Sequence, residues 1–536
     1  MKTGAIQSSA GVSPARGGEA GAMIALTRSP GRRDACPTLS AFTIFCAVLF
    51  VASLAGCAVG PDYHRPAALP AQPLPETFTT DGPVSTNSLV WKIAEPSDRK
   101  ACGDWWRPFA DAELDRLELL AVTNNQTLAA AADQFEQSRQ LAAEARANFF
   151  PQISAGGSPN GELIRQRTSF NAPSLGHAAN ESSTYNTFTA PIYLGWEVDL
   201  WGRVRRQSEA ARARYVAAAD DLESARLAIT AEVADDYFTL RALDNQHTLV
   251  VNTIDTYRRS LALTQNRRRG GIVSDLDVAQ AATQLHDAEV QLPVIELNRA
   301  QLLHALAALC GRSPVDFAVA TNGGALATVP EVPASLPGEL LEHRPDIAAA
   351  ERRMAAANAD VGVAKTAFFP AVRFNGVAGY QSVDFNSWFN WPSRLWAVGP
   401  SIQLPLFTGG FNRAQLAAAR AAYNETVAGY RQTVLNAFTE VEDALAAQRL
   451  LAEEWTAGNE AAIAARRALE IANNRYNAGL VTYLDVATAQ TTALNNENTV
   501  VQLEGSRLVT AVNLVKALGG GWPATNTLPN WKTSGK

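Results

Sequence analysis

Side chains that could carry out catalysis or bind a metal are present in this 536-residue chain, but their spacing supports neither. The sequence contains no CxxC or HExxH pattern, and its histidines are scattered: His64, His177, His247, His286, His304 and His343. Metal sites need ligands at short, regular spacings. Gly519-Gly520-Gly521 lacks the Lys-Ser/Thr that completes a phosphate-binding loop. We therefore expect no enzyme activity, no metal and no cofactor.

Cys57 is the one residue whose context indicates specific chemistry. It follows Leu54-Ala55-Gly56, an apolar run over 39–54 and a basic flank at Arg28, Arg32 and Arg33. These features are typical of an export signal that ends in a lipobox. We predict that residues 1–56 are a signal peptide and that Cys57 carries covalent lipid. A transmembrane anchor is the alternative, but the run is short for a bilayer span.

Three smaller features bear on processing and on partners. Met23 is an alternative translation start to Met1, and we assign no role to Cys102 or Cys310. The net charge is −6 and no basic stripe stands out. Because binding to a nucleic-acid backbone needs clustered Lys and Arg, we expect no nucleic-acid partner.

An internal repeat gives the strongest architectural signal. The residues from Arg258-Arg259 through Gly271 to Leu276-Asp277-Val278 recur 208 positions later, from Arg466-Arg467 through Gly479 to Leu484-Asp485-Val486. Two similar elongated halves predict a pseudo-symmetric assembly rather than a globule with one active site.

Each half contains a very long helix that turns back on itself. Residues 203–269 and 412–478 lack proline and carry apolar residues at steps of three and four. At 1.5 Å per residue, such a helix extends about 100 Å. Gly271 and Gly479 should end these helices, and Ser274 and Thr482 should cap the returning ones. Coiled-coil packing is expected, with a kink or break at Pro293.

Each half also contains two predicted strands, at about 151–158 and 186–200, and at about 371–383 and 395–406. Apolar residues alternate with small or polar ones, which suits either a soluble sandwich or a transmembrane barrel. The barrel is favoured because no other sheet is available to cover the apolar faces. The aromatic cluster Trp388, Phe389, Trp391 and Trp396 would then mark a membrane interface, and a buried aromatic core is the alternative.

Three motifs, in order, carry a resemblance to a known family. They are Cys57-Ala58-Val59-Gly60-Pro61-Asp62-Tyr63, the run from Arg344-Pro345-Asp346-Ile347 to Phe368-Phe369-Pro370, and the ending Lys516-Ala517-Leu518-Gly519-Gly520-Gly521-Trp522. Through them the chain resembles the TolC-like outer membrane efflux proteins, in particular the lipoprotein branch.

The resemblance implies an α+β membrane protein that works as a homotrimer. Four strands from each protomer would form a shared twelve-strand barrel in outer membrane lipid, and the long helices would form a periplasmic α-barrel. Drugs or other small solutes would pass through passively, delivered by an inner-membrane pump, proton-driven and of the RND type, through a periplasmic adaptor protein. The substrate is not indicated.

The helix-return turns form the periplasmic tip in this family. The resemblance assigns the adaptor contact to Gly271, Ile272, Val273, Ser274, Gly479, Leu480, Val481 and Thr482, and the gate to Asp485, Leu484, Tyr483 and Asp277. A ring of Asp485 carboxylates would favour cations. The alternative is that Asp277 and Asp485 only stabilise helix N-termini through the helix dipole.

The predicted organisation is therefore a signal peptide (1–56), a lipid anchor and extended linker (57–110), two repeats (111–320 and 338–522) and a flexible tail (523–536). An alternative function is a lipid-anchored coiled-coil scaffold of the cell envelope. That alternative explains the helices but gives the strands no purpose.

Overall fold

The computed structural model describes residues 58–68, 103–157, 187–320, 327, 329–330 and 344–520. All of them belong to the compact unit of residues 57–536. The predicted signal peptide, Cys57, Cys102, Trp522 and the predicted tail lie outside the described residues.

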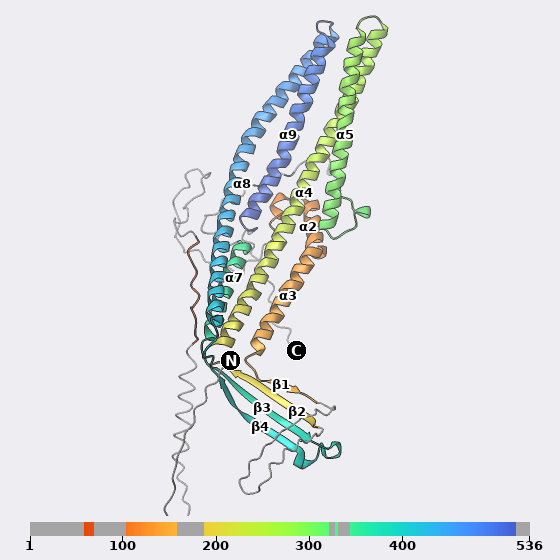
Figure 1. Cartoon of the computed structure of the whole chain (residues 1–536). Helices are drawn as coiled ribbons and strands as arrows, with labels where there is room; N and C mark the ends of the chain where they lie inside the picture. The colour runs from red at the N-terminus through yellow and green to blue at the C-terminus, as the bar shows by residue number, and fades with distance from the viewer. Residues whose placement is uncertain are drawn as a thin grey trace, which may run out of the picture. The chain divides into compact units, whose positions relative to one another are not determined.

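Two long helical hairpins make up most of the described chain. Helices α4 (Arg203–Arg269) and α5 (Asp275–Leu309) form the first, and α8 (Phe411–Asn477) and α9 (Tyr483–Ala517) form the second. Both α4 and α8 have 67 residues, and both α5 and α9 have 35. The turns of both hairpins lie at the end of the helices remote from the sheet (Figure 1).

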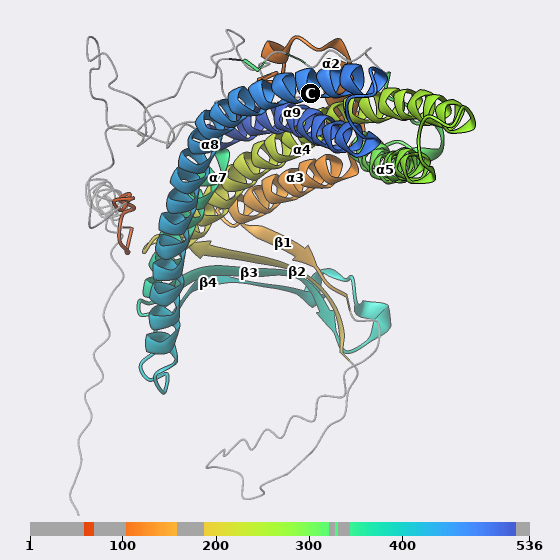
Figure 2. The ribbon, with the colours of Figure 1, turned by 90° about the horizontal axis from the view of Figure 1, so that it is seen from above.

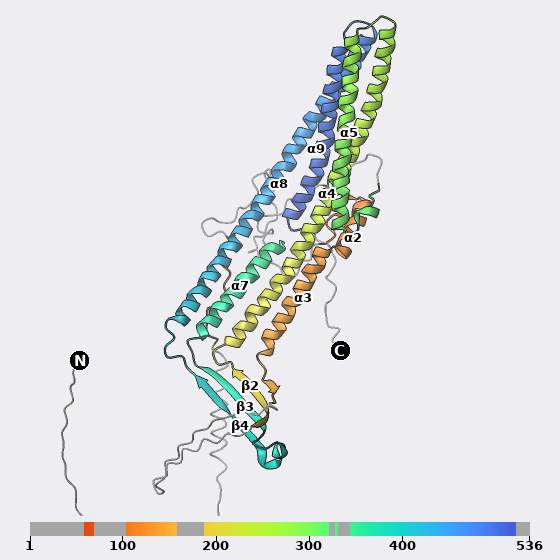
Figure 3. The same cartoon turned by 45° about the vertical axis from the view of Figure 1, so that its right-hand side comes forward.

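Two shorter helices, α3 (Gln126–Ala147) and α7 (Pro345–Thr366), have 22 residues each. Helix α4 packs against both of them, and α7 also packs against α8. Nearer the turns, α4 and α5 both contact α9. Figure 3 shows α3 and α7 beside the part of α4 and α8 nearer the sheet, and α5 and α9 beside the part nearer the turns. Of the helices in the described ranges, none is both long and apolar enough to cross a membrane.

In the sequence, apolar residues fall at helical spacing from Asp111 to about Asn148, a pattern that predicts a helix. The structure departs from this expectation at Asn125, and it shows no break at Pro293. The segment from Asp111 to Asn148 is two helices, α2 (Ala112–Asn124) and α3, because Asn125 adopts an extended backbone and its side chain caps α3. The Asn125 Nδ2 also donates to the Leu309 carbonyl at 2.8 Å. Conversely, α5 continues unbroken through Pro293, so the expected break does not occur.

Residues 103–110 are not part of an extended linker, contrary to the sequence expectation. They end in the 3-10 turn η1 (Arg107–Phe109), and Trp105, Trp106 and Phe109 are buried in the main core. The Trp105 indole donates to the Thr230 hydroxyl at 3.0 Å, and the Phe109 and Phe238 rings lie 5.0 Å apart. Burial of three aromatic rings accounts for the ordered packing of this segment. A second 3-10 turn, η2 (Pro314–Asp316), follows α5.

The four expected strands form one antiparallel sheet in the order β1-β2-β3-β4. They are β1 (Gln152–Ala155), β2 (Phe188–Val198), β3 (Ala371–Ser382) and β4 (Arg394–Gln403). The sheet curves beside the helices when viewed from above (Figure 2). Its outer strands, β1 and β4, each pair with a single neighbour among the described residues.

The strand register separates an apolar face from a polar one. Trp196 lies opposite Phe374, and Leu194 opposite Gly376, which in turn lies opposite Val398. The apolar face is open: its exposed large side chains include Ile192, Trp196, Phe374, Trp396, Val398 and Ile402. The alternate positions, including Glu197, Arg373, Asn375 and Ser401, lie on the other face.

The connection between β3 and β4 contains the 3-10 turns η3 (Phe385–Ser387) and η4 (Trp391–Ser393) and three residues of the aromatic cluster, Trp388, Phe389 and Trp391, while the fourth, Trp396, lies on β4. Trp391 is 72% exposed and Trp396 77% exposed, and Phe389 is also exposed. The alternative of a buried aromatic core is therefore wrong for these three residues. Trp388 is more sheltered and stacks on Phe389 with 4.8 Å between ring centroids.

Candidate functional site

The two hairpin turns have nearly the same backbone geometry. Gly271 and Gly479 have φ angles of 72° and 73°, a left-handed conformation that glycine adopts without a steric penalty. The residues that follow them, Ile272 and Leu480, are 75% and 70% exposed. The turns thus present an apolar side chain to the surroundings at each tip.

Both predicted acidic gate residues form capping boxes with the predicted N-caps. Asp277 Oδ2 accepts hydrogen bonds from the Ser274 backbone N–H at 2.9 Å and from its hydroxyl at 2.7 Å. Asp485 Oδ2 accepts the equivalent bonds from Thr482 at 3.1 and 3.0 Å. Partial burial of Asp277 favours its neutral form, but these hydrogen bonds to the carboxylate outweigh burial and lower its pKa. Both carboxylates therefore cap the N-terminus of the helix that follows their turn. This capping is compatible with a further role in a gate.

Direct contacts join the two hairpins just below the turns. The Arg267 guanidinium on α4 donates to the Tyr476 carbonyl at 3.2 Å and to the Asn477 side-chain oxygen at 3.1 Å, both on α8. In the other direction, the Tyr483 backbone N–H donates to Asp277 Oδ1 at 3.4 Å. The first turn of α9 is therefore connected to the first turn of α5.

Tyr483 is only 1% exposed, so its side chain lies inside the protomer rather than on the surface of the tip. Its ring meets the Tyr476 ring edge-on at 5.5 Å, and its hydroxyl donates to Gln490 Oε1 at 3.3 Å. Leu484, the next residue, is exposed. Of the predicted gate residues, Asp277 and Tyr483 are brought together, whereas Leu484 and Asp485 face outward.

The N-terminal segment, residues 58–68, lies along the helices close to the sheet. Its Val59 N–H donates to the Trp201 carbonyl at 2.9 Å, and Asp62 accepts from the buried Arg206 guanidinium at 2.8 Å. Further along, Arg65 donates to the Tyr430 hydroxyl at 2.9 Å. This segment therefore contacts both α4 and α8 and continues directly from Cys57, which lies outside the described residues.

The N-terminal segment makes one very close backbone crossing. A Cβ added to Gly60 would lie 2.8 Å from the Gly362 Cα on α7, and Gly60 has a φ of 139°. A Cβ added to Gly362 would lie 3.0 Å from the Arg206 side chain. Both glycines are thus required by the packing of the segment against the helices.

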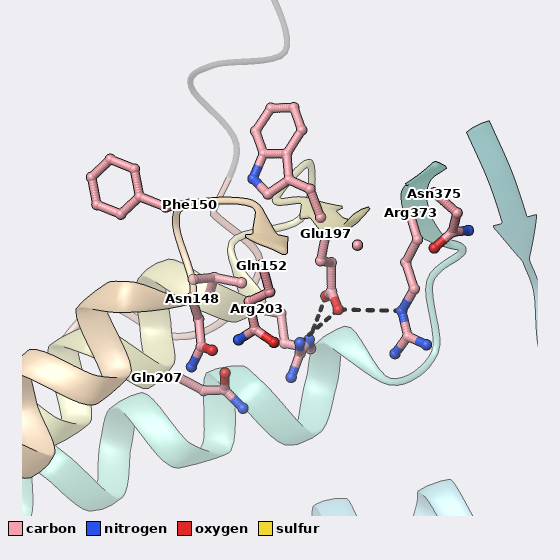
Figure 4. Close-up of a pocket in the computed structure, with 11 residues that line it drawn as sticks. Asn148, Phe150, Gln152, Glu197, Arg203, Gln207, Arg373 and Asn375 are labelled. Carbon is pink, nitrogen blue, oxygen red and sulfur yellow. Dashed lines mark hydrogen bonds and ion pairs between the residues drawn. The ribbon is translucent and has the colours of Figure 1, made fainter. Parts of the chain in front are cut away.

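A polar pocket of about 470 Å³ lies where the sheet meets the first turn of α4. Glu197 at the end of β2 lies between Arg203 and Arg373, as Figure 4 shows. The Arg203 guanidinium binds both Glu197 carboxylate oxygens, at 2.5 and 2.7 Å, and the Arg373 Nε lies 3.6 Å from one of them. The sequence analysis did not identify this cluster.

The sequence carries only weak signals for the residues that the sequence analysis did not identify, Arg267, Glu197 and Arg373. Arg267 belongs to the run Arg267-Arg268-Arg269, in which nothing distinguishes the residue that joins the hairpins. Glu197 and Arg373 stand at polar positions of alternating strands, but their pairing depends on the β2–β3 register, which the sequence does not specify.

Comparison with known proteins identifies the family. The family model described as "Outer membrane efflux protein" matches residues 119–312 and 336–520, which include the four strands, both long hairpins and their turns. The chain belongs to the outer membrane efflux protein family.

Individual family members match over most of their length. The chain is 33% identical to outer membrane protein OprJ of Pseudomonas aeruginosa over 90% of this chain and 96% of OprJ. It is 30% identical to the cation efflux system protein CusC of Escherichia coli over 89% of this chain and 98% of CusC. The solved structure of the outer-membrane channel OprN has a TM-score of 0.75 at 29% identity and covers 87% of this chain and 100% of OprN.

Membership of the outer membrane efflux protein family confirms the recognition made from the three sequence motifs. The protein is an outer membrane channel component of an efflux system, and its fold is that of the solved efflux channels. The scaffold alternative is set aside, because scaffolding is not the activity of this family.

Proposed function

We propose that three copies of this chain form one hollow conduit, with a twelve-strand barrel in the outer membrane and a helical barrel in the periplasm. The observation that carries the proposal is the four-stranded sheet with an open apolar face and two outer strands, β1 and β4. Sheet edges are not tolerated in lipid. Joining β4 of one copy to β1 of the next removes them and leaves the apolar face towards lipid.

The equal lengths of α4 and α8, and of α5 and α9, support a helical barrel to which each protomer contributes two equivalent hairpins. Helices α4 and α8 begin at Arg203 and Phe411, 208 positions apart, which is also the offset of the sequence repeat. Six long hairpins from three copies would then surround a channel about 100 Å long. Such a conduit exports solutes passively and needs neither a catalytic residue nor a cofactor.

The tip is the proposed contact surface for a periplasmic adaptor and the proposed gate. Ile272 and Leu480 offer exposed apolar contacts on turns with matching geometry. The contacts of Arg267 with α8 and of Asp277 with α9 hold the two hairpins of one protomer together. We assign the closed state to these contacts, and opening to their separation. The Asp485 side chain is exposed, and we propose that three copies of it form a ring of negative charge at the tip.

The N-terminal segment supports the proposed lipid anchor at Cys57. A Cβ on Gly202 would lie 3.0 Å from Ala58, so Ala58 packs at the junction of β2 and α4. Cys57 precedes Ala58, so acyl chains on its sulfur and amine would enter the membrane beside the periplasmic end of the barrel. Several acyl chains at one residue give stable anchoring.

The substrate is selected by the inner-membrane pump, which we propose to be of the proton-driven RND type. The relative CusC is named for cation efflux, and a wide conduit with mixed polar side chains discriminates weakly among solutes. Crosslinking from a photoreactive residue at Leu480 or Ile272 should capture the adaptor, and a substitution at the exposed Leu450 of α8, far from the tip, is the control.

The conduit is tested by purification in detergent and by planar bilayer recording. The full chain should migrate as a trimer that dissociates on heating, and it should produce discrete single-channel currents. Substitution of Cys57 by Ser removes the acylation site and should leave both properties in place. Recovery of that variant as a folded, water-soluble monomer without detergent would contradict the proposal.

A further inference from the structure

The pocket at the junction of the sheet and α4 carries an excess of positive charge. Its lining contains three charged residues, Glu197, Arg203 and Arg373. Arg203 binds Glu197 through two short hydrogen bonds, whereas Arg373 approaches it only at 3.6 Å and remains 57% exposed. One carboxylate thus faces two guanidinium groups, and Arg373 retains most of its capacity to donate hydrogen bonds.

Neutral hydrogen-bonding groups also line the pocket, together with the apolar side chains of Phe150, Trp196 and Val204. Asn148, Gln152 and Gln207 also line it, and their side-chain amides can donate hydrogen bonds into it. Figure 4 shows Asn148 and Gln207 on the same side of the cluster as Arg203. Amide and guanidinium donors around a cavity of this size suit a small oxyanion.

The position of Arg373 on an inner strand keeps its side chain accessible in an assembly. Arg373 lies on β3 directly opposite Glu197 and Ser401, on the polar face. Because β3 is an inner strand, the addition of a neighbouring copy to β1 or β4 does not cover it. In the proposed conduit, on which this step rests, the polar face surrounds the lumen. Three copies of the pocket would form one ring where the barrel joins the helices.

We propose that this pocket binds anionic solutes, those bearing a phosphate or carboxylate group, as they pass from the helical barrel into the β-barrel. Arg373 supplies the main charge contact, and the amides of Asn148, Gln152 and Gln207 supply further donors. Arg203 is paired with Glu197, so only the Arg373 guanidinium of each protomer is available to bind the anion. Binding through one guanidinium is weak enough for the anion to be released.

The proposal is tested by current recording on the full-length trimer in planar bilayers, with inorganic phosphate as the probe. Phosphate, kept as its monoanion at about pH 5, replaces chloride at constant potassium concentration, so the ionic strength also stays constant. The wild-type current should fall in a saturable manner. Arg373→Gln should raise the half-blocking phosphate concentration roughly tenfold, because it removes a charge-assisted hydrogen bond, whereas Arg373→Lys should retain most of the block.

Two further variants make the test specific. Arg394→Gln is the matched control, because Arg394 lies at the other end of the sheet and its guanidinium stacks on Trp391; its block should equal that of wild type. Asn375→Asp places a negative charge in the pocket and should weaken the block without removing Arg373.

The outcomes separate this inference from the conduit itself. If wild type conducts but phosphate does not block it in a saturable manner, or if Arg373→Gln and Asn375→Asp are blocked like wild type, the pocket does not bind anions. If wild type does not conduct at all, the conduit proposal fails instead.

Discussion

The guanidinium of Arg267 lies 4.9 Å from the centre of the Tyr476 ring and donates to the carbonyl oxygen of the same residue at 3.2 Å. Arg267 belongs to the first hairpin and Tyr476 to the second, so this one side chain joins them by a cation–π contact and a hydrogen bond. The contact lies close to both turns, near the ends of α4 and α8.

Arg267→Ala should therefore increase the resting conductance of the channel. The cation–π interaction and the hydrogen bond are together worth about 1 to 3 kcal/mol, and each 1.4 kcal/mol changes the ratio of open to closed tips about tenfold. Single-channel recording in planar bilayers measures the open fraction. Arg268→Ala is the matched control, because Arg268 pairs with Asp275 within its own hairpin. Equal open fractions for the two variants would show that the hairpin contact does not hold the tip closed.

Asp485 can be tested separately as a gate and as a helix cap. Asp485→Asn keeps an oxygen that can accept from the Thr482 N–H but removes the charge, whereas Asp485→Ala removes both. If Asp485 forms a charged ring, both variants should reduce the preference for cations, measured as a reversal potential in a salt gradient, and Asp485→Ala should also raise the conductance.

If Asp485 serves only as a cap, the two variants should differ in stability instead. Asp485→Ala would then lower the free energy of unfolding by about 0.5 to 2 kcal/mol, and neither variant would alter ion selectivity. Asp277→Asn provides the comparison, because its carboxylate has the same capping geometry but also accepts from the Tyr483 N–H on the other hairpin.

Gly362→Val should displace the N-terminal segment and destabilise the helices beneath it. The new side chain would collide with Arg206, whose guanidinium binds Asp62 of the N-terminal segment. Overpacking of this kind costs about 1 to 3 kcal/mol. Thermal unfolding and the rate of proteolysis within residues 58–68 report the effect.

Gly429→Ala is the matched glycine control for that experiment. Gly429 is also inside a helix, but nothing lies within 4 Å of the position of its added Cβ. The substitution should stabilise α8 by about 0.5 to 1 kcal/mol, since alanine favours the helix over glycine. A Gly362→Val protein as stable and as protease-resistant as wild type would disprove the close crossing.

Glu118 should make the protein less stable as the pH rises. It is 0% exposed, and its carboxylate oxygens have no hydrogen-bond partner among the described residues. Burial raises the pKa of Glu118 well above its ordinary value, and the neighbouring Asp115 adds to the shift. The folded state therefore binds more protons than the unfolded state, and stability falls once the pH exceeds the unfolded pKa of about 4.3.

Glu118→Gln should reduce that loss, so its melting temperature should differ less between pH 5 and pH 8 than that of wild type. Asp235, whose pKa burial raises to about 7, contributes in the same direction and leaves some dependence. Glu113→Gln is the control, because Glu113 should change the pH dependence of stability in the opposite direction. The Arg116 side chain lowers the pKa of Glu113, so Glu113 stabilises the fold above its unfolded pKa and that contribution is lost at low pH. Identical pH profiles for Glu118→Gln and wild type would contradict the assignment.

Much of the fold could be predicted from the sequence because its signals are local and repeated. Proline-free runs with apolar steps of three and four identified α4 and α8, and Gly271 and Gly479 marked their ends within two residues. Alternation identified the four strands. The packing of Trp105 was missed because it depends on Thr230, which is more than 100 positions away. The break at Asn125 was missed because a polar residue inside a helical pattern does not by itself reveal that its side chain caps a new helix.

The features of the candidate site also divide into those predicted from the sequence and those that only the structure shows. The sequence by itself determined the turns, their caps and the presence of carboxylates at Asp277 and Asp485, since a glycine, a hydroxyl residue and an acid within seven positions suffice for that local geometry. Only the tertiary structure decided that Tyr483 is buried, that Arg267 joins the hairpins and that Arg373 meets Glu197. These facts depend on which helix faces and which strand register come together, and many registers are compatible with the same local pattern.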